Sequence, residues 1–194
     1  MLYLEKRDYQ DAKVFLEKSL KLKIELLGEN HPKVGLALNN MGSVYLLTKK
    51  YKTAEVYFRA ALKNFSKSLK PGHMWFAMSD YWLGRSLMGE KKYASAEIYF
   101  KKSLLIREKV FSKNHYMTCL SRGDLGISLL KQNKLTEAEK LLLNAFNHYR
   151  NEVGKQDKNS LRFAENLVEL YKKKGETIKA DHYKKIAQKL SGKI

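Results

Sequence analysis

Three histidines occupy one repeated position in this sequence, and their type and spacing could do chemistry. His31, His73 and His115 follow one another at intervals of 42 residues. Imidazole nitrogens bind zinc and act as general bases, so a regular series of histidines could indicate a metal site or a catalytic site. Cys119, the single cysteine, follows the third histidine closely along the chain. Such a site would form only if the fold brought these side chains together.

The elements that carry the histidines argue against convergence. Residues 27–62 read as a helix start, a helix with one apolar face, a polar turn and a second apolar-faced helix. The pattern recurs at intervals of 42 residues, which predicts stacked helical hairpins. Equivalent positions in successive hairpins lie roughly 16–20 Å apart, whereas zinc binds nitrogen ligands at about 2 Å. We therefore predict that the histidines cap helices and pack in loops, with no metal site and no cofactor.

Small residues recur at fixed positions within the predicted helices. Gly42 lies inside a helix, where glycine costs about 1 kcal/mol relative to alanine, and copies occur at Gly84 and Gly126. This recurrence predicts that a neighbouring helix approaches closely at each glycine. We expect equally tight crossings at an alanine that recurs in the second helix of each hairpin, namely Ala12, Ala54, Ala96, Ala138 and Ala180.

A larger set of these residues resembles the signature of the tetratricopeptide repeat. The pattern Gly-x-x-Tyr, Tyr-x-x-Ala and Phe-x-x-Ala-Leu is formed by Gly42, Tyr45, Tyr51, Ala54, Phe58, Ala61 and Leu62. The 42-residue period and the Gly-Glu-Asn-His-Pro loop are similar to the long-helix subclass of kinesin light chains, and to arrays in bacterial serine/threonine kinases and regulators. The resemblance implies an all-α fold, a right-handed superhelical solenoid of antiparallel helix pairs. About four full hairpins would follow a partial N-terminal one.

We expect a single array over residues 1–194. Its units would be a partial one at about 1–32, three at 33–74, 75–116 and 117–158, and a C-terminal capping unit at 159–194. The sequence begins inside a repeat, so either a shortened helix serves as a cap or the sequence is a piece of a longer protein. We favour the second explanation, because half a helix covers an apolar end poorly.

In tetratricopeptide arrays the first helices of successive hairpins line a concave groove, and the resemblance carries this role to twelve positions. Asn39 offers a donor and an acceptor to a peptide backbone, Tyr81 an aromatic anchor, and Arg85 a bidentate partner for a carboxylate. We therefore expect a non-catalytic interaction scaffold, a module of a larger regulatory protein, that binds a protein or peptide with apolar anchors and acidic groups. The groove positions are Leu36, Asn39, Ser43, Leu46, Met78, Tyr81, Arg85, Met88, Leu120, Ile127, Leu130 and Arg162.

The charge balance leaves a second hypothesis open. Lysine and arginine number 38 against 20 acidic residues, giving a net charge of +18. Seven of the 38 basic residues are arginines, and a lysine-rich composition is typical of solvated helix faces. The alternative is a nucleic-acid-binding helical repeat that uses the basic surface.

The sequence contains no nucleophile–base pair, glycine-rich phosphate loop or ligand cluster, so we do not expect an enzyme. It also contains neither a membrane-spanning apolar run nor the apolar core of a signal peptide. We expect a cytoplasmic protein without a membrane partner.

Overall fold

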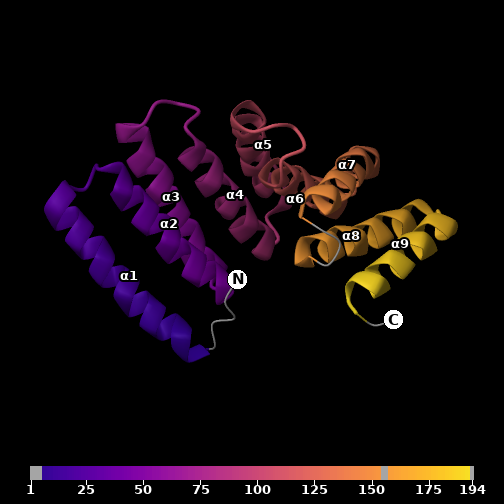
Figure 1. Ribbon diagram of the computed structural model, residues 1–194, viewed down its shortest axis with the longest axis horizontal. Helices are drawn as coiled ribbons and strands as arrows, with labels where there is room; N and C mark the ends of the chain where they lie inside the picture. Colours follow the sequence, from indigo (N-terminus) through magenta and orange to yellow (C-terminus); the bar gives the residue numbers. More distant parts are fainter. Residues whose placement is uncertain (1–5, 154–156, 193–194) are drawn as a thin grey trace. The chain divides into compact units, whose positions relative to one another are not determined.

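Helices form the regular structure of this protein. A computed structural model describes residues 6–153 and 157–192, and these ranges contain helices and no strand. The predicted all-α fold is confirmed (Figure 1). The ends of the first and last predicted repeats, residues 1–5 and 193–194, lie outside the described residues. The helices are α1 (Lys6–Leu27), α2 (Pro32–Leu47), α3 (Tyr51–Ser68), α4 (Met74–Gly89), α5 (Tyr93–Val110), α6 (Tyr116–Lys131), α7 (Leu135–Val153), α8 (Lys158–Lys174) and α9 (Thr177–Leu190).

In three of the predicted hairpins, the two consecutive helices pack on each other. Helix α2 packs on α3, α6 on α7 and α8 on α9. Each of the four full repeats contains two helices, and each first helix begins within one residue of the predicted repeat boundary. Helix α1 stands where the second helix of a hairpin would stand, and it packs on α2.

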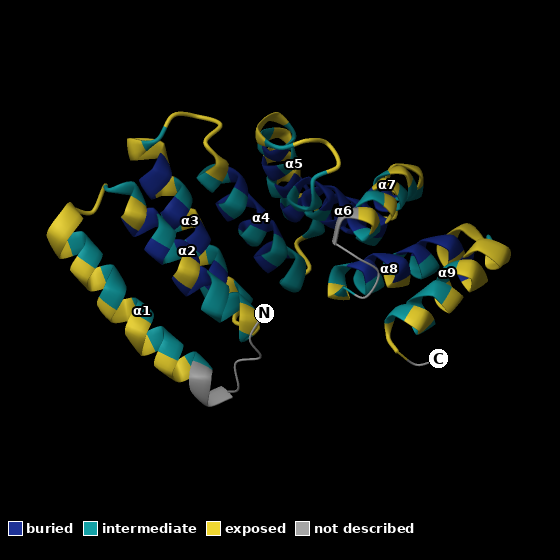
Figure 2. Cartoon of the chain, in the orientation of Figure 1, coloured by how far each residue is buried: buried dark blue, intermediate teal, exposed yellow. Residues whose placement is uncertain are grey.

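The chain divides into two compact units, Met1–Tyr99 and Phe100–Ile194. In the first unit, α2 contacts α1, α3 and α4, and α3 also contacts α4. In the second unit, α6 and α8 contact each other, and both contact α7. Buried residues follow the inner faces of the helices within each unit (Figure 2). The single array over residues 1–194 stays a prediction.

The three histidines begin helices, as predicted. The Nδ1 atom of His31 accepts a hydrogen bond from the Lys33 backbone N–H at 3.2 Å. His73 and His115 do the same for the N–H groups two residues further on. Asp157 replaces histidine in the last repeat, and its Oδ1 accepts from the Asn159 N–H at 2.7 Å. Each side chain thus satisfies a backbone donor that the first helical turn leaves unpaired.

Two of the helical glycines lie against large side chains, as predicted. A Cβ atom on Gly42 would lie 2.7 Å from Cε1 of Phe58, and one on Gly126 would lie 2.9 Å from Cγ of Leu142. Both distances are too short for a real side chain, so these glycines allow the two helices of a hairpin to cross closely. The alanines Ala54, Ala96 and Ala138 are fully buried.

Two further glycines have a packing role that the sequence did not reveal. Gly35 lies against the ring of Phe65 and Gly123 against the ring of Phe163, and neither site has room for a Cβ atom. These contacts join α2 to α3 and α6 to α8.

Candidate peptide-binding faces

The first unit exposes parts of two matching rows of predicted groove residues. The rows lie at the same register on α2 and α4, 42 residues apart, and these two helices contact each other. All six side chains are partly exposed, four of them are apolar and one carries a positive charge. We call this surface the α2/α4 face, formed by Leu36, Ser43, Leu46, Met78, Arg85 and Met88.

Asn39 lies between these rows and is only 2% exposed. Its Nδ2 donates to Oγ of Ser79 at 2.7 Å, and its Oδ1 accepts from the same hydroxyl at 2.9 Å. Both polar atoms of the amide are therefore engaged inside the protein. In this structure Asn39 joins α2 to α4 and so positions the two rows.

Tyr81 is also buried, with 3% of its surface exposed. Its ring packs edge-on against Trp82, with the ring centroids 4.9 Å apart. Its hydroxyl accepts a hydrogen bond from Nη1 of Arg85 at 3.2 Å. Tyr81 thus orients the guanidinium of a partly exposed arginine, and it presents little of its own ring to solvent.

In the second unit, more of the predicted groove residues are buried. Ile127 is 5% exposed and Leu130 is fully buried, whereas Leu120 is partly exposed. Arg162 forms an ion pair with the buried carboxylate of Asp124. The second unit therefore offers a smaller apolar surface at these positions than the first.

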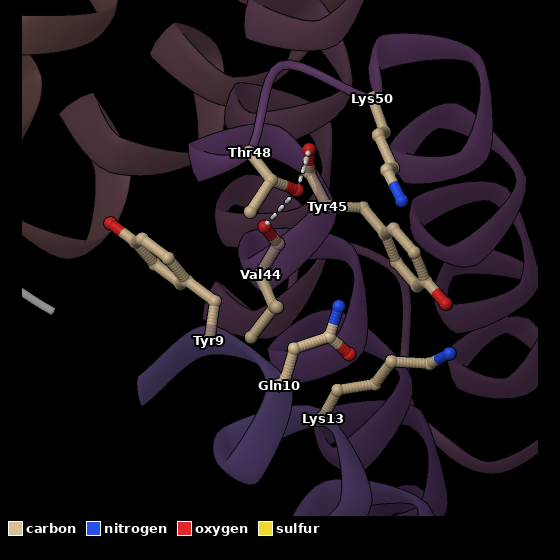
Figure 3. A pocket seen from close by; sticks show the side chains of 7 residues that line it. All are labelled: Tyr9, Gln10, Lys13, Val44, Tyr45, Thr48 and Lys50. Carbon is tan, nitrogen blue, oxygen red and sulfur yellow. Dashed lines mark hydrogen bonds between the residues drawn. The ribbon is translucent and has the colours of Figure 1, made fainter. Parts of the chain in front are cut away.

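A hollow between α1 and α2 was not predicted from the sequence. It has a volume of about 190 Å³ and lies where the C-terminal end of α2 faces the beginning of α1 (Figure 3). The sequence holds one signal for it, because Lys13 stands at a position where the later repeats carry glutamate. We call it the α1/α2 pocket, lined by Tyr9, Gln10, Lys13, Val44, Tyr45, Thr48 and Lys50.

The described residues contain no group of three or more histidine, cysteine, aspartate or glutamate side chains that could hold a metal ion. Cys119 is buried, and its Sγ donates to the Asn114 carbonyl oxygen at 3.3 Å. In the same part of the chain, no helix is long and apolar enough to cross a membrane.

Stacked helix pairs with repeated capping and crossing residues define a helical-hairpin repeat protein. The family profile of the tetratricopeptide repeat matches residues 1–67 and 75–151, which together exceed half of the chain. The chain therefore belongs to the tetratricopeptide repeat family. This fold typically serves as a non-catalytic scaffold, commonly for protein–protein interaction. The sequence matches no curated protein.

Solved structures share the fold at low sequence identity. TPR-like repeats assigned to a kinesin light chain of P. anserina are 17% identical, with a TM-score of 0.78 and coverage of 98% of this chain and 90% of that one. The apo form of RapI is 16% identical, with a TM-score of 0.81 and coverage of 97% and 66%. A Rap protein complexed with competence and sporulation factor is 15% identical, with a TM-score of 0.74 and coverage of 96% and 51%. The predicted kinesin-light-chain-like repeat fold is confirmed.

Proposed function

We propose that this chain is a non-catalytic protein-interaction scaffold that binds a peptide segment of a partner protein on the α2/α4 face. The observation that carries the proposal is the pair of matching, partly exposed rows on two contacting helices. The solved complex of a Rap protein with competence and sporulation factor adds support by analogy of fold. We further propose that the chain serves as a module of a larger regulatory protein.

The chemistry of the α2/α4 face favours a peptide with apolar anchors and an acidic group. Leu46, Met78 and Met88 are partly exposed, and covering apolar surface gains roughly 25 cal/mol per Å². Methionine adapts to differently shaped partners because its side chain is flexible and polarisable. Arg85 can hold a carboxylate by two parallel hydrogen bonds.

A library of random peptides of about 15 residues, selected for binding to the protein, tests this proposal. We expect the enriched peptides to combine apolar residues with glutamate or aspartate. Their dissociation constants, measured by fluorescence anisotropy, should rise at least about tenfold for Met88→Asp and for Arg85→Glu. Circular dichroism melting would verify that both variants stay folded.

Two matched controls lie elsewhere on the first unit. Val56 is 65% exposed on α3, so Val56→Asp places the same new charge outside the α2/α4 face. Lys63 is also exposed on α3, so Lys63→Glu matches the charge change of Arg85→Glu. Equal weakening by the control variants, or no effect of Met88→Asp and Arg85→Glu, would show that peptides bind elsewhere.

A nucleic-acid-binding role is the alternative. Its support is a set of exposed lysines at the helix turns of the first unit, Lys49, Lys50, Lys52 and Lys91. Lysine is a point charge without the planar fork that reads bases or clamps phosphates, so this support is weaker than that for a peptide.

A further inference from the structure

The α1/α2 pocket combines two lysines with aromatic and apolar walls. Lys13 comes from α1, and Lys50 lies in the turn that follows α2. In Figure 3 the side chain of Tyr45 lies between those of the two lysines. The Tyr45 hydroxyl interacts with the Lys13 ammonium group. Val44 and the ring of Tyr9 add apolar surface to the wall.

The equivalent position in the later repeats holds a carboxylate. Adding 42 residues to position 13 gives Glu55, and further steps give Glu97 and Glu139. Lys13 therefore reverses the charge that Glu55 and Glu139 place between the second helix of one hairpin and the first helix of the next.

Glu55 shows how the first unit holds this carboxylate. Its Oε1 accepts from Nε of Arg59 at 2.7 Å, and its Oε2 lies 3.3 Å from Nζ of Lys92. Burial by itself raises the pKa of Glu55, but the hydrogen bonds from Arg59 and Lys92 outweigh it and hold the pKa below its usual value. The site therefore favours a charged carboxylate.

Glu139 is held in the same way in the second unit. Its Oε1 accepts from the Tyr171 hydroxyl at 2.9 Å, and its Oε2 pairs with the ammonium group of Lys174. The hydrogen bond from Lys174 is the main cause that lowers the pKa of Glu139. A lysine ammonium group thus pairs with the carboxylate in both repeats, together with Arg59 at Glu55 and with Tyr171 at Glu139.

The α1/α2 pocket keeps one donor from each of these two sites, has lysine in place of the carboxylate at position 13, and carries Glu17 next to it where the following repeat has Arg59. Lys50 occupies the position that Lys92 occupies in the next repeat. Tyr45 occupies the position that Tyr171 occupies three repeats later. Lys50 forms no ion pair with the residues that the structure describes. Lys13 pairs with Glu17 at 3.6 Å, but both side chains are well exposed, and such pairs contribute little. The lining of the pocket therefore carries two lysines and no carboxylate, and the acidic partner of Lys13 lies outside that lining.

We propose that the α1/α2 pocket binds the carboxylate of an acidic side chain from a partner polypeptide, in the place that the later repeats fill with their own glutamate. The ligand carboxylate lies between Lys13, Lys50 and the Tyr45 hydroxyl. Its methylene groups and an apolar neighbour in the partner contact Tyr9 and Val44. The pocket uses side chains other than those of the α2/α4 face, so the two proposals succeed or fail separately.

The first arm of the test supplies the carboxylate from within the protein. In a Glu17→Gln background, which removes the neighbouring like charge, we expect Lys13→Glu to raise the melting temperature relative to Lys13→Gln. The matched pair Lys63→Glu and Lys63→Gln, at an exposed position on α3, should show no such difference. A Lys13→Glu variant no more stable than Lys13→Gln would overturn the proposal.

The second arm supplies the carboxylate from outside. Acetylated Leu-Glu-Tyr and Leu-Gln-Tyr peptides are titrated against the ¹⁵N-labelled protein and followed by NMR. We expect the glutamate peptide to shift the amide signals of Tyr9, Val44 and Thr48, and to bind at least about tenfold more tightly than the glutamine peptide. Lys13→Glu in the Glu17→Gln background should abolish these shifts, whereas Lys63→Glu and Met88→Asp should leave them unchanged.

Three results would contradict the proposal in this arm. Equal shifts with both peptides would mean that the carboxylate is not recognised. Inorganic phosphate that produces the same shifts at matched ionic strength would indicate a general anion site. A single-stranded oligonucleotide that displaces the glutamate peptide from the pocket would assign it to nucleic acid instead.

Discussion

Asp157 shows at the scale of a single residue how one repeated position keeps its structural role while its chemistry changes. It takes the place of the capping histidines, and its carboxylate accepts hydrogen bonds from the Asn159 N–H and from the Tyr149 hydroxyl at 2.9 Å. Burial alone raises the pKa of Asp157, but these hydrogen bonds outweigh it and hold the pKa below its usual value. Folding therefore favours the charged form of the cap.

This pKa shift predicts a pH dependence of stability. Because the folded-state pKa lies below the unfolded-state value near 3.8, the stabilisation is complete above that value and is lost as the pH falls through the folded-state pKa. Asp157→Asn should therefore lose less free energy of unfolding than the wild type between about pH 5 and about pH 2.5, measured by urea denaturation. At neutral pH, Asp157→Ala should cost about 1 kcal/mol through loss of the cap.

Asp181 provides the control, since it is exposed on α9 and forms no helix cap. Asp181→Asn should follow the wild-type pH dependence. An Asp157→Asn variant with the wild-type dependence would mean that this carboxyl does not link protonation to folding.

At the scale of the helix, close crossings within hairpins depend on small residues that the helix itself disfavours. Gly42 and Gly126 allow Phe58 and Leu142 to lie directly against the opposite helix backbone. The sequence could predict this role because glycine recurs at the same register despite its low helix propensity. Gly35 and Gly123 do not recur through the repeats, so the same reasoning missed them.

Gly42→Ala tests the crossing of α2 and α3. The new methyl group would lie 2.7 Å from the Phe58 ring, and overpacking of this kind costs about 1–3 kcal/mol. This exceeds the gain of about 1 kcal/mol from better helix propensity, so we expect net destabilisation in thermal and urea unfolding. A second change, Phe58→Leu, should be less harmful in the Gly42→Ala background than in the wild type, because it relieves the overlap. Additive effects of the two changes would argue against direct contact.

At the scale of the whole molecule, the net charge of +18 must be reconciled with a peptide-binding role. Several lysines are used within the fold, since Lys92 pairs with Glu55 and Lys174 with Glu139. Others lie exposed at helix turns and contribute a long-range positive field. Such a field favours acidic partners in general and accelerates their association.

Salt dependence separates this general attraction from nucleic-acid recognition. We expect a single-stranded RNA of about 30 nucleotides to bind only weakly at about 50 mM salt. This binding should be lost by about 200 mM salt, because salt ions compete for the phosphates. An electrophoretic mobility shift series over that range measures this. Retention of submicromolar affinity at about 200 mM salt would instead support the nucleic-acid alternative.

The repeat pattern by itself determined the helices, their pairing and their caps. Apolar periodicity and a fixed 42-residue interval place the start of each hairpin's first helix within about one residue, because both signals are local and are repeated along the chain. The roles of His31 and Gly42 followed from the same repetition. Family membership followed as well, since the signature residues recur in most copies and the family profile matches residues 1–67 and 75–151.

Only the tertiary structure decided which of the predicted groove positions reach solvent. Asn39 is engaged by Ser79, Tyr81 is buried and Leu130 is fully covered, although each lies on the helix face expected from its register. Exposure depends on which side chains of neighbouring helices cover a position, and those neighbours lie about 40 residues away in the sequence. The α1/α2 pocket was hidden for the same reason: a hollow exists only where packed helices leave a space that no side chain fills.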